Sequence, residues 1–305
     1  MWRDRALDAW RVIEADAFTQ RGGQTRVLAG PDGPDAPLWP LIHVLWAAAD
    51  LRAAGADVPI DRLAEVLERH RSGDAYRATP RERARYFDDN AWLGLASLRL
   101  ADTTGDPTWR ACATRLAAFT AEGEHPAGGV RWREGAESRN TCSTASSAWL
   151  RGWALGSDDA SAGRWVGWLE RTLRGHDGLF ADRIEGVDVD RYAWSYNQGA
   201  VVAAREALDR PDDGLVEATI HHWDGARSWR EPPPFLAIAV RALSEVPGTR
   251  DAVVAWLDPH LERLLERARD PGSGWFSRGG LGTYDGTKTI DQAAIVQLLA
   301  LRSLA

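Results

Sequence analysis

The chain has 305 residues, of which 44% are hydrophobic and 27% are charged, and its formal net charge is −7. This composition is typical of a globular protein with a sizeable core and excludes a disordered chain. The basic residues are scattered along an acidic chain and form no stripe suited to phosphates, so we expect no nucleic acid among the partners.

The N-terminal segment is charged and lacks the apolar core of a secretory signal, and no later run is long and apolar enough to span a bilayer. We therefore expect a cytoplasmic protein without membrane insertion, although a signal peptide that had been removed would leave no trace. Cys112 and Cys142 have no second cysteine at C-x-x-C spacing, which indicates two free thiols rather than a disulfide framework or a zinc site.

Helical periodicity predicts twelve helices. In chain order they are expected near residues 4–18, 39–54, 60–71, 89–103, 107–121, 141–155, 160–174, 195–208, 214–225, 234–245, 250–267 and 289–303. One boundary is marked by its chemistry, because Gly105 suits a helix end while Asp106 and Pro107 suit the cap and first position of the next helix.

The connections between these helices alternate in length. Long segments precede the second, fourth, sixth, eighth and twelfth helices, at residues 21–38, 72–88, 122–140, 175–194 and 270–288, and a shorter one, 226–233, precedes the tenth. The connections that leave the even-numbered helices are brief, as in helix hairpins. If six hairpins close into a ring, the long segments all lie on one face, where the even-numbered helices begin.

The hydrophobic pattern divides the helices in the same way. Those near 39–54 and 89–103 are apolar on most sides, whereas those near 4–18, 60–71 and 250–267 carry a charged stripe. No repeat recurs at fixed spacing, which disfavours a solenoid. We predict an all-α fold, an (α/α)6 barrel forming a single domain over residues 1–305. Short β-hairpins are expected in the long loops, at residues 128–133 and 178–184.

Two adjacent aspartates, Asp88 and Asp89, open the predicted fourth helix between aromatic residues. An aspartate at this place can simply cap the helix and satisfy its free N–H groups. Successive helical residues point about 100° apart, so the two carboxylates also lie close enough to divide the roles of acid and nucleophile. Their position on the long-loop face favours the second interpretation.

Other polar and aromatic side chains gather on the same predicted face. They are Trp132 and Asn140 before the sixth helix, Asp182, Trp194, Tyr196, Asn197 and Gln198 around the start of the eighth, and Trp275, Tyr284 and Asp285 before the twelfth. Aromatic faces stack on sugar rings, and carboxylates and amides bond hydroxyl groups, so this mixture suits a polyhydroxylated ligand. Each residue could equally hold a loop in place.

Several of these segments resemble glycoside hydrolase family 76, the endo-α-1,6-mannanases. The likeness rests on residues 86–92 (Tyr-Phe-Asp-Asp-Asn-Ala-Trp), 104–106, 128–132, 139–141 and 194–199 (Trp-Ser-Tyr-Asn-Gln-Gly). It extends over most of the chain and is weakest before Leu38 and after Arg230. The resemblance implies an (α/α)6 barrel and a retaining mechanism with neither a metal nor another cofactor.

The resemblance also implies roles for individual residues. Asp88 would be the nucleophile and Asp89 the acid/base of a hydrolase that cleaves α-1,6-linked mannosides. The implied substrate contacts are Asn140, Asp182, Tyr196, Asn197 and Gln198, with Trp132 and Trp194 as stacking platforms. We expect a monomer that binds an α-mannoside. Many relatives are secreted, whereas this chain shows no export signal, so the substrate could be an intracellular oligosaccharide or glycolipid instead of polymeric mannan.

Other readings stay open. Histidine-dependent sugar epimerases use the same kind of barrel, and His43, His125 and His176 are expected near the long-loop face. A carbohydrate-binding barrel without turnover and a transglycosylase are further alternatives, whereas the aspartate motifs of terpene cyclases are absent. The basic segment from Arg77 to Arg85 is either a solvated face or a contact for an anionic group of the substrate.

Overall fold

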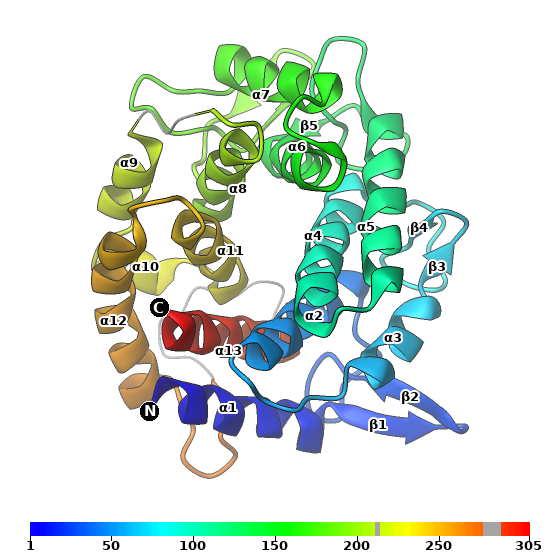
Figure 1. Ribbon diagram of the computed structural model, residues 1–305, viewed down its shortest axis with the longest axis vertical. Helices are drawn as coiled ribbons and strands as arrows, with labels where there is room; N and C mark the ends of the chain where they lie inside the picture. Colours follow the sequence, from blue (N-terminus) through cyan, green and yellow to red (C-terminus); the bar gives the residue numbers. More distant parts are fainter. Residues whose placement is uncertain (211–213, 277–287) are drawn as a thin grey trace.

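The computed structural model describes residues 1–210, 214–276 and 288–305. Six helices form a closed inner ring, in which each helix packs against the next and the last packs against the first (Figure 1). They are α2 (Leu38–Ala53), α4 (Phe87–Thr104), α6 (Thr141–Leu155), α8 (Ser195–Glu206), α11 (Pro233–Ser244) and α13 (Lys288–Leu304). The even-numbered helices of the prediction, from the second to the twelfth, therefore form the inner ring, as expected.

The outer layer is built from the helices that carry a polar stripe. They are α1 (Trp2–Asp16), α3 (Ile60–Glu68), α5 (Pro107–Thr120), α7 (Ala160–Thr172), α9 (Leu215–His222) and α12 (Arg250–Arg267), with a short additional helix α10 (Ala226–Arg230). The fold is the predicted (α/α)6 barrel. Among the helices in the described ranges, none combines the length and the hydropathy needed to cross a membrane.

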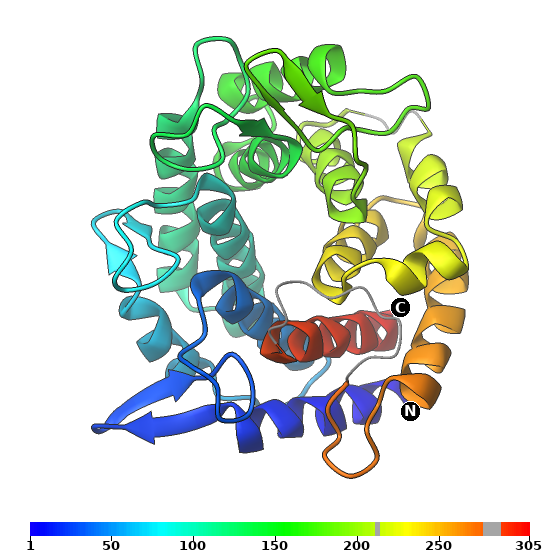
Figure 2. The ribbon, with the colours of Figure 1, turned by 180° about the vertical axis from the view of Figure 1, so that it is seen from behind.

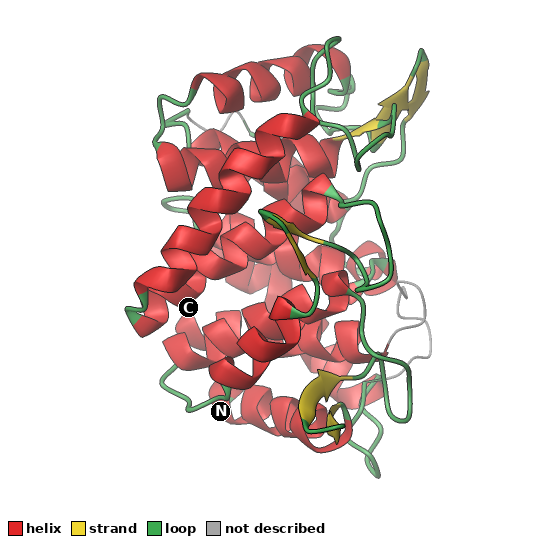
Figure 3. Cartoon of the chain, turned by 90° about the vertical axis from the view of Figure 1, so that its right-hand side faces the viewer, coloured by secondary structure: helices red, strands yellow, loops and turns green. Residues whose placement is uncertain are grey.

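The long loops carry small strand pairs on one side of the barrel (Figure 3). β1 (Phe18–Arg21) pairs with β2 (Gln24–Val27), and β3 (Arg71–Ser72) pairs with β4 (Ala75–Tyr76). β6 (Arg183–Glu185) lies between β5 (Arg139–Asn140) and β7 (Asp188–Asp190). The first two pairs were not predicted, and Phe18, which was expected in the first helix, begins β1.

The two predicted hairpins differ from the structure. At 128–133, Val130, Arg131 and Arg133 form single bridges to three separate segments, so no continuous ladder forms. The second hairpin lies later in the chain than predicted, at 183–190. The buried Phe180 cannot pair in the predicted hairpin because its backbone N–H and carbonyl are both hydrogen-bonded to a side chain. Its N–H donates to the side chain of Gln198, and its carbonyl accepts from the same side chain, at 2.8 and 3.0 Å.

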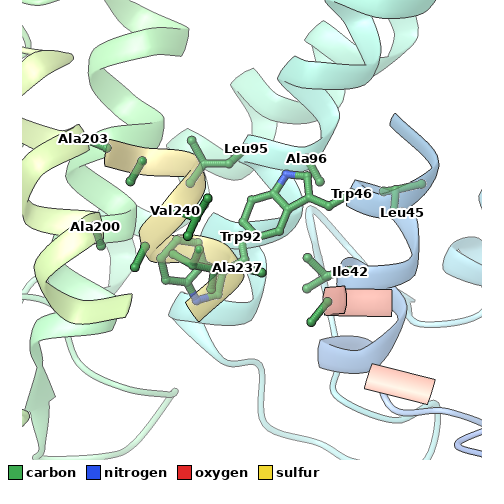
Figure 4. Close-up of a cluster of buried hydrophobic side chains, with 14 of the residues drawn as sticks. Ile42, Leu45, Trp46, Trp92, Leu95, Ala96, Ala200, Ala203, Ala237 and Val240 are labelled. Carbon is green, nitrogen blue, oxygen red and sulfur yellow. The ribbon is translucent and has the colours of Figure 1, made fainter. Parts of the chain in front are cut away.

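Large aromatic and small aliphatic side chains of the inner helices fill the centre of the barrel (Figure 4). Trp92 of α4 lies 6.0 Å from Trp46 of α2, measured between ring centroids. Elsewhere the helices approach closely at glycine. A Cβ atom on Gly199 of α8 would lie 2.7 Å from the Cα of Ala239 on α11, so only glycine fits at this position.

A buried ion pair joins three inner helices at the end of the barrel with the short turns. Asp50 of α2 is 0% exposed and accepts hydrogen bonds from both terminal nitrogens of Arg241 on α11, which is 3% exposed. Arg99 of α4 lies 3.4 Å from the same carboxylate.

We predict that Arg241→Met lowers the free energy of unfolding by about 3–5 kcal/mol, because Asp50 then stays buried without its main partner. Arg302→Met is the matched control, since Arg302 pairs with Asp258 where the side chains are 22% and 33% exposed. Its loss should cost about 0–1 kcal/mol. Chemical denaturation of both variants measures the difference, and equal losses would contradict the assignment of Asp50 as a buried anchor.

Candidate active site

A cleft of about 510 Å³ opens on the face of the barrel that carries the long loops. Seven of the nine predicted site residues line it: Asp88, Asp89, Trp132, Asn140, Asp182, Trp194 and Tyr196. Ten further described residues line the cleft, and among them Trp39, Cys142, Arg183 and Phe235 were not predicted. Trp39, Cys142 and Phe235 lie in the first turns of inner helices. The argument that placed Asp88 on the long-loop face, that inner helices begin there, therefore also applies to them.

The start of α4 is fixed by contacts on both of its sides. Phe87 is buried and stacks on Phe119 with ring centroids 5.0 Å apart, and its N–H donates to the carbonyl of Trp132 at 3.0 Å. The buried side chain of Asn90 accepts from the N–H of Tyr76 and donates to the carbonyls of Tyr76 and Tyr86, at 2.8, 2.9 and 2.7 Å. Asp88 and Asp89 therefore lie in a first turn that is held in place.

Asp88 accepts three hydrogen bonds. The N–H of Asp89 reaches Oδ1 at 2.9 Å, while Nε1 of Trp132 and the thiol of Cys142 reach Oδ2 at 3.1 and 3.5 Å. Burial raises the pKa of Asp88 to about 6, and these three donors oppose the rise because they stabilise the charged form. The N-cap position belongs to Tyr86, so neither aspartate caps the helix.

Asp89 has a different environment. Burial raises the pKa of Asp89 well above its ordinary value, and the negative charges of Asp88 and Glu82 raise it further. Among the described residues no hydrogen bond to the Asp89 carboxyl group is found. Two adjacent carboxyl groups whose pKa values are pushed apart can hold one proton between them, with Asp89 protonated and Asp88 ionised.

Further polar groups of the cleft come from the loops before α6 and α8 and from the first turn of α8. Asp182 is buried and accepts from Nδ2 of Asn197 at 3.1 Å, and burial raises the pKa of its carboxyl group. The Oδ1 atom of Asn140 is buried and has no hydrogen-bond partner within the described part of the chain. Tyr196 stacks on Phe235 with ring centroids 4.1 Å apart. Asn140, Asp182 and Tyr196 therefore line the cleft with polar atoms that can bond a ligand.

Two tryptophans present ring surface to the cleft. Trp132 is 38% exposed and lies edge-on to Tyr86, with ring centroids 5.0 Å apart. Trp194 packs against Tyr192 and Phe235, at 4.2 and 5.2 Å between centroids. Both rings are therefore held by other aromatic side chains while they border the cavity.

Asn197 and Gln198 lie behind the cleft. Both are fully buried, and neither lines the cavity. Asn197 holds Asp182, whereas Gln198 donates to the carbonyls of Phe180 and Trp194. Their contacts are with the loop before α8.

Other predicted face residues also lie away from the cavity. Trp275 is buried and donates to Asp16 at 2.7 Å, and Tyr284 and Asp285 lie outside the described residues. All seven histidines belong to the described part of the chain, and none of them lines the cleft. His43, for example, is buried and bonded to Gln297 of α13.

Arg85 closes the basic segment with an internal ion pair. Its guanidinium donates to both oxygens of Glu134, at 2.5 and 3.0 Å. In the described ranges no cluster of three or more His, Cys, Asp or Glu side chains is arranged to hold a metal ion.

Comparison with solved structures finds the same fold in several family 76 enzymes. A family 76 mannosidase of Bacteroides thetaiotaomicron VPI-5482 is 17% identical, with a TM-score of 0.81 over 99% of this chain and 98% of that chain. The α-1,6-mannanase GH76A of Salegentibacter sp. HEL1_6 is 21% identical, with a TM-score of 0.78 over 100% and 99%.

An inactive variant of the Salegentibacter enzyme was solved with α-1,6-mannotriose; it is 20% identical to this chain, with a TM-score of 0.76 over 100% and 99% of the two chains. In that variant two adjacent aspartates are replaced by asparagine.

No protein of curated function matches the chain significantly. The sequence model described as "Glycosyl hydrolase family 76" matches residues 34–208, which is more than half of the chain and includes the start of α4 and the loops before α6 and α8. The chain therefore belongs to glycosyl hydrolase family 76, and the protein is a glycoside hydrolase.

Proposed function

We propose that the protein is a retaining hydrolase of α-1,6-linked mannosides, with Asp88 as the nucleophile and Asp89 as the acid/base. The observation that carries this proposal is the unequal environment of the two adjacent carboxyl groups in one cleft. Asp88 accepts three hydrogen bonds, and Asp89 lies beside its charge without a donor of its own among the described residues.

The proposed reaction has two displacements. Asp88 attacks the anomeric carbon while Asp89 donates its proton to the glycosidic oxygen, so that the bond to the leaving sugar breaks and a mannosyl ester of Asp88 forms. Asp89, now ionised, takes a proton from a water molecule that attacks the anomeric carbon, and Asp88 is released as a carboxylate. Each carboxyl group thus returns to its starting charge.

The relatives support the substrate and the pair. A variant of the Salegentibacter α-1,6-mannanase with two adjacent aspartates changed to asparagine is described as inactive and binds α-1,6-mannotriose. Here Asp88 and Asp89 are the adjacent pair that lines the cleft. The sugar hydroxyls would bond Asn140, Asp182 and Tyr196.

Aromatic rings are available for the apolar faces of the sugars. Trp132 and Trp194 line the cleft on the loops before α6 and α8 and offer stacking surfaces. Trp132 has a second role in this scheme, because its Nε1 also donates to the nucleophile at 3.1 Å.

The first test replaces each carboxyl group by an amide. Asp89→Asn should lower kcat on α-1,6-mannotetraose by about 10²–10⁴-fold, because the proton donor is lost, and Asp88→Asn should lower it at least as far. Asp102→Asn is the matched control, since Asp102 lies near the other end of the same helix and pairs with the exposed Arg110. Full activity of either cleft variant, with an unchanged circular dichroism spectrum, would refute the proposal.

The second test separates the two roles. Asp89→Ala should release the phenol of an aryl mannoside with a very acidic phenol in a fast burst, because that leaving group needs no proton, and turnover should then be slow because the water of the second step has lost its base. Asp88→Ala should stay inactive on it, and added azide should restore turnover to a mannosyl azide of inverted configuration, because azide fills the place of the carboxylate. The reverse pattern would exchange the two assignments.

The third test concerns pH. Asp88 must be ionised, so kcat/KM should rise as the pH rises through about 6, where the pKa of Asp88 lies, and it should fall at higher pH as Asp89 loses its proton. Cys142→Ala removes a donor to Asp88, which raises the pKa of Asp88 and moves the acidic limb to higher pH. Cys142→Ser keeps a donor and is the control; identical acidic limbs in the two variants would contradict the role of the thiol.

A further inference from the structure

A second cavity lies beside the active-site cleft. Its volume is about 660 Å³, and it is lined by Arg21, Arg26, Pro34, Asp35, Ala36, Arg69, Thr79, Pro80 and Arg81. These side chains come from the β1–β2 hairpin, the loop after it, the end of α3 and the loop before α4. We call this cavity the arginine pocket. In Figure 2 the hairpin extends from the edge of the barrel near α3.

The pocket holds more positive than negative charge. Of the residues that the structure describes, Asp35 is the one acidic residue that lines it. The nearest nitrogens of Arg21, Arg26 and Arg69 lie 3.9, 2.9 and 3.3 Å from its carboxylate oxygens. Among the described residues no acidic side chain pairs with Arg81. Four positive charges and one negative charge leave an excess of three positive charges in a protein whose net charge is −7.

This arrangement suits an anion with several oxygen atoms. The carboxylate of Asp35 accepts hydrogen bonds from Arg26 and Arg69, and Arg21 lies 3.9 Å from it. The planar guanidinium group matches the geometry of phosphate oxygens. A phosphate monoester carries up to two negative charges and three free oxygens, so it balances the excess better than a single carboxylate. The side chain of Arg81 is exposed and can close on such a group.

The arginine pocket and the cleft share a wall. Ala36 and Thr79 line the pocket, and their chain neighbours Pro37 and Ala78 line the cleft. The two segments are joined by a hydrogen bond of 2.8 Å from the N–H of Leu38 to the carbonyl of Ala78. A ligand that extends from the cleft across this wall therefore reaches the arginines.

We propose that the arginine pocket binds a phosphate group carried by the saccharide whose mannosyl residues occupy the cleft, an inference that rests on the proposed function. The neutral part of the ligand is held in the cleft, and its phosphate is held across the shared wall. The enzyme then acts preferentially on phosphorylated manno-oligosaccharides.

The test compares three substrates: neutral α-1,6-mannotetraose and two derivatives with one phosphate monoester at the non-reducing or the reducing end. At least one derivative should have a kcat/KM about tenfold higher than the neutral compound, mainly through a lower KM. Arg81→Gln should abolish this preference and leave turnover of the neutral compound unchanged, because Arg81 does not line the cleft. Arg83→Gln is the matched control, since Arg83 is exposed on the same loop and does not line the pocket.

Inorganic phosphate supplies an independent readout. It should inhibit turnover of the preferred derivative competitively. Arg81→Gln should remove that inhibition and leave the turnover of neutral mannotetraose unchanged. The inference is overturned if all three substrates are cleaved equally well, if Arg83→Gln has the same effect as Arg81→Gln, or if phosphate inhibits the neutral substrate equally. Failure to cleave any of the three would instead overturn the proposed function.

Discussion

The closure of six inner helices into a ring is the constraint on which the site depends. The ring closes where α13 meets α2, and there the buried side chain of Gln297 donates to both Nδ1 and the carbonyl of His43, at 2.9 and 3.1 Å. Burial lowers the pKa of His43 to about 3, so this histidine stays neutral and can accept the bond. An outer helix returns the chain between successive inner helices, so every inner helix begins at the same end of the barrel. The closed ring then brings residues from distant parts of the chain into one cleft (Figure 1).

A recurring contact connects the inner helices to the loops that precede them. Near the start of α4, α6, α8 and α13, a buried side chain accepts a hydrogen bond from a backbone N–H in the segment that precedes the helix. The four pairs are Asn90 with Tyr76, Thr144 with Val130, Gln198 with Phe180, and Gln292 with Phe276, at 2.8, 3.0, 2.8 and 2.9 Å. These bonds satisfy loop N–H groups that would otherwise be buried without a partner. Those at α4, α6 and α8 hold loops that contribute residues to the cleft.

The predictions from sequence that succeeded are those that depend on local patterns. Connection lengths and apolar patterning determine the barrel, because they reflect local packing that each helix needs. They also bring Asp88, Asn140 and Tyr196 to one face. Amides are ambiguous, since Asn140 lines the cleft while Gln198 clamps a loop, and only the fold decides between these environments. The bridges at Val130, Arg131 and Arg133 reach partners in three separate segments, which no local alternation reveals.

The contrast between Asp88 and Asp89 also depends on the elements around α4. Both residues lie in the first turn of one helix, so the helix dipole acts on both. The donors to Asp88 differ in origin: Trp132 comes from the loop before α6, and Cys142 comes from α6 itself. At Asp89 burial and the negative charge of Asp88 raise the pKa, and the charge of Glu82, from the loop before α4, raises it further. A helix start alone would give two aspartates with similar pKa values. The donors from the loop before α6 and from α6 itself make their environments different.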